Sequence, residues 1–248
     1  MRLAATAAPE PERVDAPDAA TPSARGSEAD SEAAKSATEA AAVAEGIAAR
    51  PLLWSPRSDF GAPARREGGA TRGTGQDVGV VALAPPIEGT GLTLASRPVL
   101  YWYLAADSPH PIDFTLVDPD EIAPVVEITL DEAGAAGLHR IDLEALGVEL
   151  RVGPRYQWFV TVVSDREDRS ADVLAGASIE RVDEPDLSAR LERAEAPEER
   201  IRLLAGAGIW YDAFALAQRD ADRAPEDPAA RARVVSLLEQ IDLERVVR

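Results

Sequence analysis

The chain has 248 residues, and its 44 acidic side chains outnumber its 26 basic ones, which gives a formal net charge of −18 at pH 7. Such an acidic chain lacks the basic face that nucleic-acid phosphates or an anionic membrane surface would require. It contains no cysteine, which excludes disulfide frameworks, thiolate zinc sites and a cysteine nucleophile. It also has no run of about 18 apolar residues that could span a bilayer.

Residues 1–76 are predicted to form a disordered arm. Alanine, proline, glutamate and serine dominate this part, and aromatic and β-branched residues are few. Such a composition cannot bury enough apolar surface to offset the loss of chain entropy. The first residues carry a positive charge and a short alanine-rich stretch, without the apolar centre of a secretory signal. We expect either a cytoplasmic protein or one whose signal was trimmed or lies upstream.

A glycine-rich stretch near the end of this arm carries three arginines, Arg65, Arg66 and Arg72. Their guanidinium groups could dock onto the acidic remainder of the chain or bind a partner through charge-assisted hydrogen bonds. A flexible basic linker is the alternative. We name the three arginines as candidate partner-binding residues.

Residues 77–184 are predicted to form an antiparallel β-sandwich of the immunoglobulin or fibronectin type III kind. Short strand-like runs are separated by proline, glycine or aspartate roughly every 8 to 15 residues, which is typical of such folds. The expected strands lie at residues 78–84, 92–94, 99–104, 112–117, 125–130, 138–141, 155–163 and 177–182.

Four residues of this region are expected to have structural roles. Tyr156 and Trp158 share one face of the seventh strand, which should be buried. Leu150, Gly153 and Tyr156 have the spacing of a tyrosine corner, in which the tyrosine hydroxyl bonds to nearby backbone. Trp102 lies between two tyrosines on the third strand and should point to the opposite face from both. One face would pack the sandwich and the other a covering element, although a platform for binding sugars is an alternative.

Residues 185–248 are predicted to be a helical segment containing a tetratricopeptide-like hairpin that packs on the sandwich. Helices are expected at residues 187–194, 197–207, 209–223 and 228–240. The sequence around Trp210 and Tyr211 resembles one tetratricopeptide-like unit, whereas a stable array needs about three. A hairpin that hides its apolar face is therefore favoured over a peptide-binding array, for which Trp210 and Tyr211 would be the partner-binding residues.

Catalytic and metal-binding motifs are missing from the sequence. His110 and His139 lack metal-ligand spacing, and no nucleophile elbow or phosphate-binding loop is present. Acidic residues at 118–121 and 165–172 could form a glycosidase pair or a calcium site, but solvated loop charge is the favoured interpretation in a chain with so many carboxylates. We assign no catalytic, metal-binding or cofactor-binding residue and expect no cofactor.

Four motifs occur in order along the chain, at residues 60–73, 93–103, 153–158 and 208–213. Together they resemble the bacterial domain of unknown function family 928, from about Phe60 to the C-terminus. The family carries no established activity, so the resemblance implies no catalytic residue. It implies an exported or envelope-associated protein, with a cytoplasmic location as the alternative.

The predicted function is that of a non-enzymatic interaction or scaffold module whose partner is another protein. One alternative is a carbohydrate-binding or small-ligand-binding β-sandwich. The other is a carboxylate-dependent hydrolase, which would need two acidic side chains facing each other across a cleft.

Overall fold

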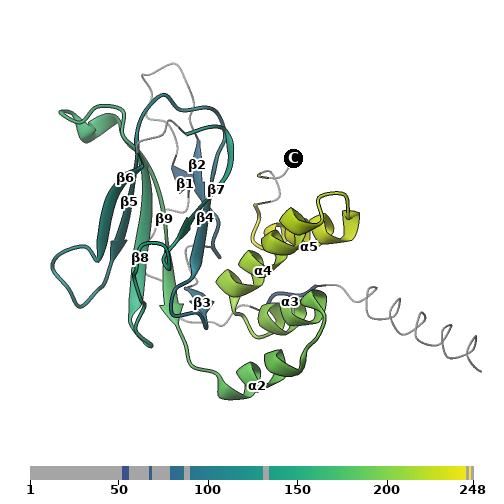
Figure 1. Ribbon diagram of the computed structural model, residues 1–248. Coiled ribbons are helices and arrows are strands. Elements are labelled where there is room, and N and C mark those ends of the chain that lie inside the picture. The colour runs from purple at the N-terminus through teal and green to yellow at the C-terminus, as the bar shows by residue number, and fades with distance from the viewer. Residues whose placement is uncertain are drawn as a thin grey trace, which may run out of the picture. The chain divides into compact units, whose positions relative to one another are not determined.

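The computed structural model describes residues 52–55, 67–68, 79–86, 90–130, 134–243 and 246. All of these residues belong to one compact unit, Leu52–Arg248. This unit is mainly β, and its α-helices follow the last strand along the chain (Figure 1). Among the helices of the described residues, none combines the length and the apolarity that crossing a bilayer requires.

The described strands form two sheets. The first sheet has the order β1 (Glu67–Gly68), β2 (Val80–Ala82), β4 (Val99–Leu104), β7 (Gly137–Asp142). The second sheet has the order β3 (Gly91–Thr93), β9 (Val173–Arg181), β8 (Arg155–Val162), β5 (Ile112–Val117), β6 (Val126–Leu130). A short 3-10 helix, Arg169–Ala171, precedes β9.

One strand pair corrects the prediction of an antiparallel sandwich. β3 runs parallel to β9, with Gly91 opposite Ile179 and Thr93 opposite Arg181, whereas the other paired strands are antiparallel. The chain leaves β2 at Pro85 and Pro86, which have no N–H to donate to a strand ladder. It then crosses to the second sheet before returning to the first as β4, so β3 becomes an edge strand beside β9.

The side chains that form the core follow the two-residue alternation along the strands. Every second residue of β5 is buried, and the buried face of β8 begins with Tyr156 and Trp158, as predicted. Trp158 is 0% exposed and Trp102 2% exposed, and both belong to one continuous core cluster. Trp102 stacks on His139 of the neighbouring strand, with 5.5 Å between ring centroids.

The turn into β8 is closed by the hydroxyl of Tyr156. This oxygen accepts a hydrogen bond from the backbone N–H of Arg151 at 3.0 Å. Gly153 has φ +102°, a conformation that a glycine adopts without strain. Arg151 then donates through Nη2 to Asp118 at 2.8 Å. Although burial opposes it, hydrogen bonding by Arg151, Asp120 and Tyr156 lowers the pKa of Asp118.

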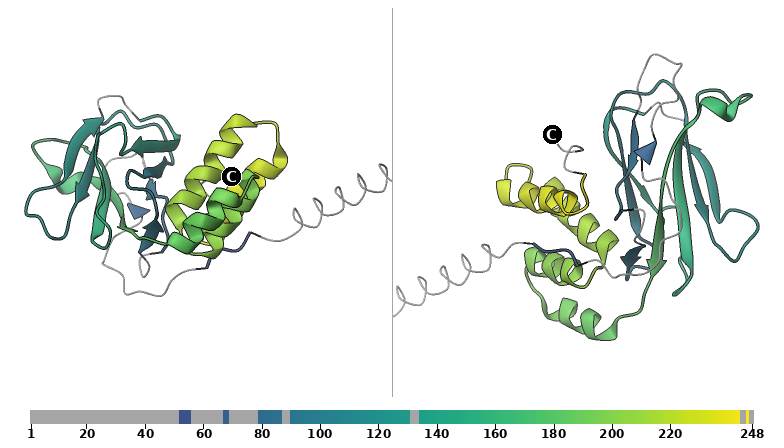
Figure 2. Two further views of the ribbon diagram at one scale, coloured as in Figure 1. Left: turned by 60° about the horizontal axis from the view of Figure 1, so that its bottom comes forward. Right: turned by 180° about the vertical axis from the view of Figure 1, so that it is seen from behind.

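The helices are α2 (Pro185–Arg193), α3 (Pro197–Gly206), α4 (Trp210–Arg223) and α5 (Pro228–Glu239). Three of them begin with a proline, whose missing N–H would have no partner in the first turn anyway. Helices α3, α4 and α5 pack in succession beside the sandwich (Figure 2). Helix α4 contacts β3 and β4 as well as α3 and α5, and it thus links these two helices to the sheets.

Two pieces of the predicted disordered arm are placed within the fold. Glu67–Gly68 forms β1, which pairs with β2. Residues 52–55 pack against the helices, and Leu52 belongs to the core cluster. Leu52 and Trp54 supply apolar surface that the average composition of residues 1–76 conceals. The other residues of the predicted arm, including Arg65, Arg66 and Arg72, lie outside the described residues.

Candidate functional site

A cleft of about 390 Å³ lies between the sandwich and the helices. The turn from β3 to β4 forms one wall, and residues of α2, α3 and α4 form the others. The apolar part of the lining consists of Leu94, Ala95, Pro98, Val99, Leu191, Leu204, Ala215 and Leu216. The volume of the cleft falls in the range of roughly 300–1,000 Å³ that is typical of ligand sites.

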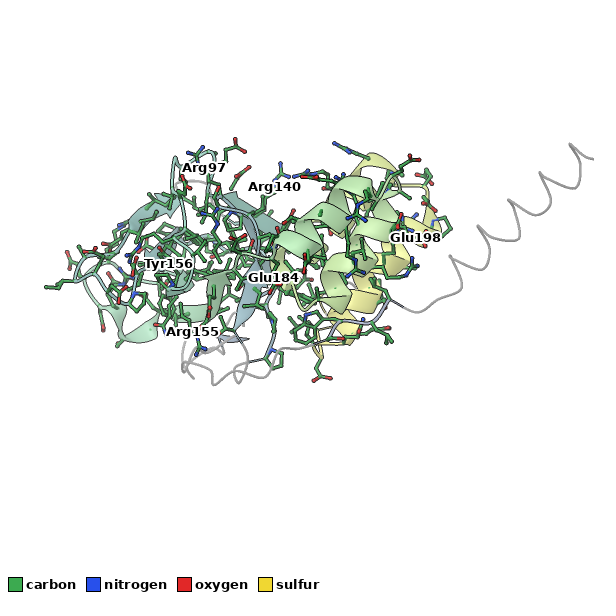
Figure 3. All side chains as sticks on the ribbon, turned by 90° about the horizontal axis from the view of Figure 1, so that it is seen from below. Arg97, Arg140, Arg155, Tyr156, Glu184 and Glu198 are labelled. Atoms are coloured by element: carbon green, nitrogen blue, oxygen red, sulfur yellow. The ribbon has the colours of Figure 1, made fainter. Side chains whose placement is uncertain are left out.

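Three arginines, Arg97, Arg200 and Arg219, carry positive charge into this cleft, and all three are exposed. Arg97 lies 3.7 Å from Glu149, and Arg200 donates through Nε to the carbonyl of Leu191 at 3.2 Å. Figure 3 shows Arg97 and Arg140 along one edge of the sandwich, with Arg155 at the opposite edge. The arginines form a locally cationic rim on a chain whose net charge is −18.

The walls of the cleft are held together by the first turn of α4. The hydroxyl of Tyr211 accepts a hydrogen bond from Nε1 of Trp158 at 2.9 Å and donates one to the carbonyl of Ser178 at 3.1 Å. Burial raises the pKa of Tyr211, so the hydroxyl stays protonated and can act as the donor in the hydrogen bond to Ser178. These two hydrogen bonds join α4 to β8 and β9.

Gly91 provides the space that the ring of Tyr211 occupies. A Cβ atom at this position would lie 2.4 Å from Cε2 of Tyr211, well inside van der Waals contact. The backbone of β3 can therefore approach the ring only where it has no side chain.

Asp212 lies next to Tyr211 and is the acidic residue in the described lining of the cleft. Its Oδ2 accepts a hydrogen bond from the N–H of Leu94 at 3.1 Å, at the end of β3. Burial raises the pKa of Asp212, and hydrogen bonds from Thr93 and from the N–H groups of Leu94 and Ala95 offset only part of that effect. The carboxyl group thus ties α4 to the β3–β4 turn.

Aromatic contacts extend this junction along α4. Phe214 meets Tyr101 of β4 edge to face, with centroids 5.1 Å apart, and stacks on Trp210 at 5.7 Å. Nε1 of Trp210 donates to the carbonyl of Leu83 at 3.4 Å. Tyr101 therefore faces the helices, whereas the next residue of β4, Trp102, stacks on His139 of β7.

Of the five predicted partner-binding residues, the structure describes two, and both are buried. Trp210 and Tyr211, named as partner-binding candidates, are 0% and 2% exposed and contact their own sandwich. Arg65, Arg66 and Arg72 lie outside the described residues. Sequence reasoning missed the three arginines of the cleft, because they come from separate parts of the chain. The only signal was the inclusion of Arg97 in one of the four family motifs.

The acidic loops hold the fold together locally. Asp118 and Asp120 both contact Nη2 of Arg151, at 2.8 and 3.3 Å. Asp165 and Asp168 accept backbone N–H groups two residues later along the chain. Within the described ranges, no group of three or more histidine, aspartate or glutamate side chains could hold a metal ion.

Residues 67–248 match the family described as Domain of Unknown Function (DUF928). The match covers most of the chain, and the chain therefore belongs to this family, as its sequence motifs indicated. No curated protein matches the chain.

Replacing Tyr211 by phenylalanine should lower the free energy of unfolding by about 1–3 kcal/mol, because the indole N–H of Trp158 would lose its buried acceptor. Urea denaturation measures this change. Tyr103→Phe is the matched control, since the hydroxyl of Tyr103 takes part in none of the hydrogen bonds found among the described residues. An equal loss in both variants would contradict the role given to Tyr211.

The raised pKa of Asp212 predicts a pH dependence of stability. Above pH 3.8, the ordinary pKa of an aspartate, the unfolded chain loses this proton while the folded chain retains it. The stability contributed by Asp212 is therefore greatest below pH 3.8 and falls as the pH rises through the pKa of the folded state. Urea denaturation of Asp212→Asn at several pH values should therefore show stability relative to wild type that rises with pH. Asp118→Asn should show the opposite slope, because the pKa of Asp118 is lowered. A flat difference for Asp212→Asn would contradict this assignment.

Proposed function

We propose that this DUF928 family member is a non-catalytic interaction module that holds an acidic segment of a partner protein in the cleft between its sandwich and its helices. The observation that carries the proposal is the cleft itself, with Arg97, Arg200 and Arg219 around an apolar lining. The proposed scaffold is an immunoglobulin-like sandwich to which the C-terminal helices are docked.

Strand order and the Tyr156 hydrogen bond support the immunoglobulin-like assignment. β2, β4 and β7 follow the order of strands A, B and E, and the remaining sheet contains the order C, F and G as β5, β8 and β9. Tyr156 opens the strand that corresponds to F, and its hydroxyl bonds to backbone five residues earlier. This is the position and the bond of a tyrosine corner.

The chemistry of the rim favours carboxylate ligands. A guanidinium group presents its donors in a planar fork that matches the two oxygens of a carboxylate. Arg219 and Arg200 come from different helices and Arg97 from the β3–β4 turn, so a ligand with several carboxylates could contact more than one wall. An extended segment in which acidic and aliphatic residues alternate would present its carboxylates to the rim and its apolar side chains to the lining.

The other two functions have less support from the described residues. A hydrolase needs two carboxyl groups across the cleft, and the described lining contributes one, Asp212. A sugar-binding platform needs exposed aromatic faces, and the described aromatic side chains are buried or half-buried. A small carboxylate with an apolar body remains a second candidate ligand, because the cleft volume suits it.

Fluorescence anisotropy with a labelled peptide tests the proposal. The peptide Glu-Leu-Glu-Leu-Glu-Leu should bind about tenfold more tightly than its Gln-Leu counterpart, because charge-assisted hydrogen bonds are stronger than neutral ones. Its affinity should fall with rising salt, since the rim is exposed to solvent. Hexanoate tests the small-ligand candidate, which requires it to displace the peptide.

Variants locate the binding to the cleft. Replacing Arg200 and Arg219 together by glutamine should weaken binding of the acidic peptide about tenfold or more. Arg231→Gln is the matched control, because Arg231 is an exposed arginine of α5 that does not line the cleft. Equal binding of the two peptides, or an equal effect of the control variant, would overturn the proposal.

A further inference from the structure

Residues 52–55 contact the helices and lie beside α3, where Figure 1 draws them in dark blue. The side-chain amide of Gln240 bonds to the backbone of this segment twice. Its Nε2 donates to the carbonyl of Leu52 at 2.8 Å, and its Oε1 accepts the N–H of Trp54 at 2.6 Å. A third hydrogen bond runs from the N–H of Ser55 to the carbonyl of Ala205, at 3.1 Å. All three bonds involve backbone atoms of the segment, so they would form with other extended sequences.

The side chains of the segment alternate between buried and exposed. Leu52 is 9% exposed and belongs to the core cluster, whereas Leu53 is 62% exposed. The ring of Trp54 meets Trp210 edge to face, with centroids 5.6 Å apart. Backbone hydrogen bonds combined with pockets for alternate side chains are the usual means by which proteins recognise extended peptides.

Contacts other than the segment hold the receiving residues in place. Gln240 also donates through Nε2 to the carbonyl of Ser236, one turn earlier along α5. Trp210 stacks on Phe214 and donates to Leu83. The surface formed by Ala205, Trp210 and Gln240, which we term the Gln240 groove, is therefore fixed by α3, α4 and α5 themselves.

The segment leaves one polar group unsatisfied in this position. The buried indole N–H of Trp54 finds no acceptor among the described residues. A buried donor without a partner subtracts from the free energy that the contact gains. The segment is thus held by three backbone hydrogen bonds and by the side chains of Leu52 and Trp54. The unsatisfied indole N–H of Trp54 makes this binding weaker than it would be with an acceptor in place.

From these contacts we infer that the Gln240 groove is a peptide-binding site, which the chain's own Leu52–Ser55 segment occupies as an intramolecular competitor. Its ligand is an extended peptide of another protein with an aliphatic and an aromatic side chain two residues apart. Tethering gives the internal segment an effective concentration in the millimolar range, so an external peptide must displace it. Trp210 is buried while the internal segment occupies the Gln240 groove, and it contacts the external peptide once that peptide has displaced the segment.

The test uses the full chain with Leu52 and Trp54 both replaced by serine, which removes the two internal anchors. The probe is a fluorescein-labelled peptide Pro-Leu-Leu-Trp-Ser-Pro, the sequence of residues 51–56. Fluorescence anisotropy should show binding to this double variant about tenfold or more tighter than to the wild type, because the competitor has been weakened. A peptide with serine at its first leucine and its tryptophan should not bind.

Two further variants identify the groove. Adding Gln240→Ala to the double variant should reduce the affinity about tenfold, since two hydrogen bonds to the peptide backbone are lost. Gln218→Ala is the matched control, because Gln218 bonds to the exposed side chain of Asp222 instead. A folded double variant that binds the peptide no more tightly than the wild type would overturn the inference.

Instability of the double variant would not obscure the result. If the variant is unfolded in circular dichroism, recovery of its helical signal on addition of the peptide supports the inference. Failure of a large excess of peptide to restore that signal overturns it.

Discussion

The hydroxyl group of Tyr211 carries the interaction on which the arrangement of sheets and helices depends. It lies in the first turn of α4 and bonds to Trp158 and Ser178, which belong to neighbouring strands of the second sheet. Gly91 admits the ring, and Asp212 bonds to the backbone just beyond β3. Three different strands are thereby connected to one helical turn. A buried polar network of this kind is stable only when its members are satisfied together, and it therefore fixes one orientation.

Both proposed binding surfaces follow from that orientation. The helix that is docked by Tyr211 contributes Asp212, Leu216 and Arg219 to the cleft. The same helix contributes Trp210 to the Gln240 groove. A change in the angle of α4 would therefore alter both surfaces, although they differ in chemistry. The cleft offers guanidinium groups to carboxylates, and the groove offers an amide and an indole to a peptide backbone and an aromatic ring.

The sequence predicted the regular elements closely because their periodicity is strong. Observed β4 and β5 coincide with the predicted strands, and each helix begins and ends within about two residues of its predicted limits. Strand β9 begins at Val173, earlier than predicted, since the acidic loop before it obscured the alternation. The parallel pairing of β3 depends on a crossing between sheets, which no local pattern specifies. The buried roles of Tyr156, Trp158 and Trp102 were predictable for the same reason as the strands.

The candidate site was much less accessible to sequence reasoning. The arginines of the cleft come from a turn and two helices, and only the docking of α4 brings them around one space. Trp210 and Tyr211 stood out as aromatic residues in a helical pattern, but their burial against the sandwich depends on distant partners. Tyr211, for example, bonds to Trp158 and Ser178, which lie 53 and 33 residues away along the chain. Residues 52–55 were missed because four residues cannot shift the average composition of a long polar stretch.

Native-state hydrogen exchange at increasing urea concentration tests most directly whether sandwich and helices form one cooperative unit. The backbone amides of α4 and of β8 should exchange through the same global opening, with equal free energies and an equal dependence on urea. Exchange of the α4 amides through a separate opening of lower free energy, while β8 stays protected, would contradict the account.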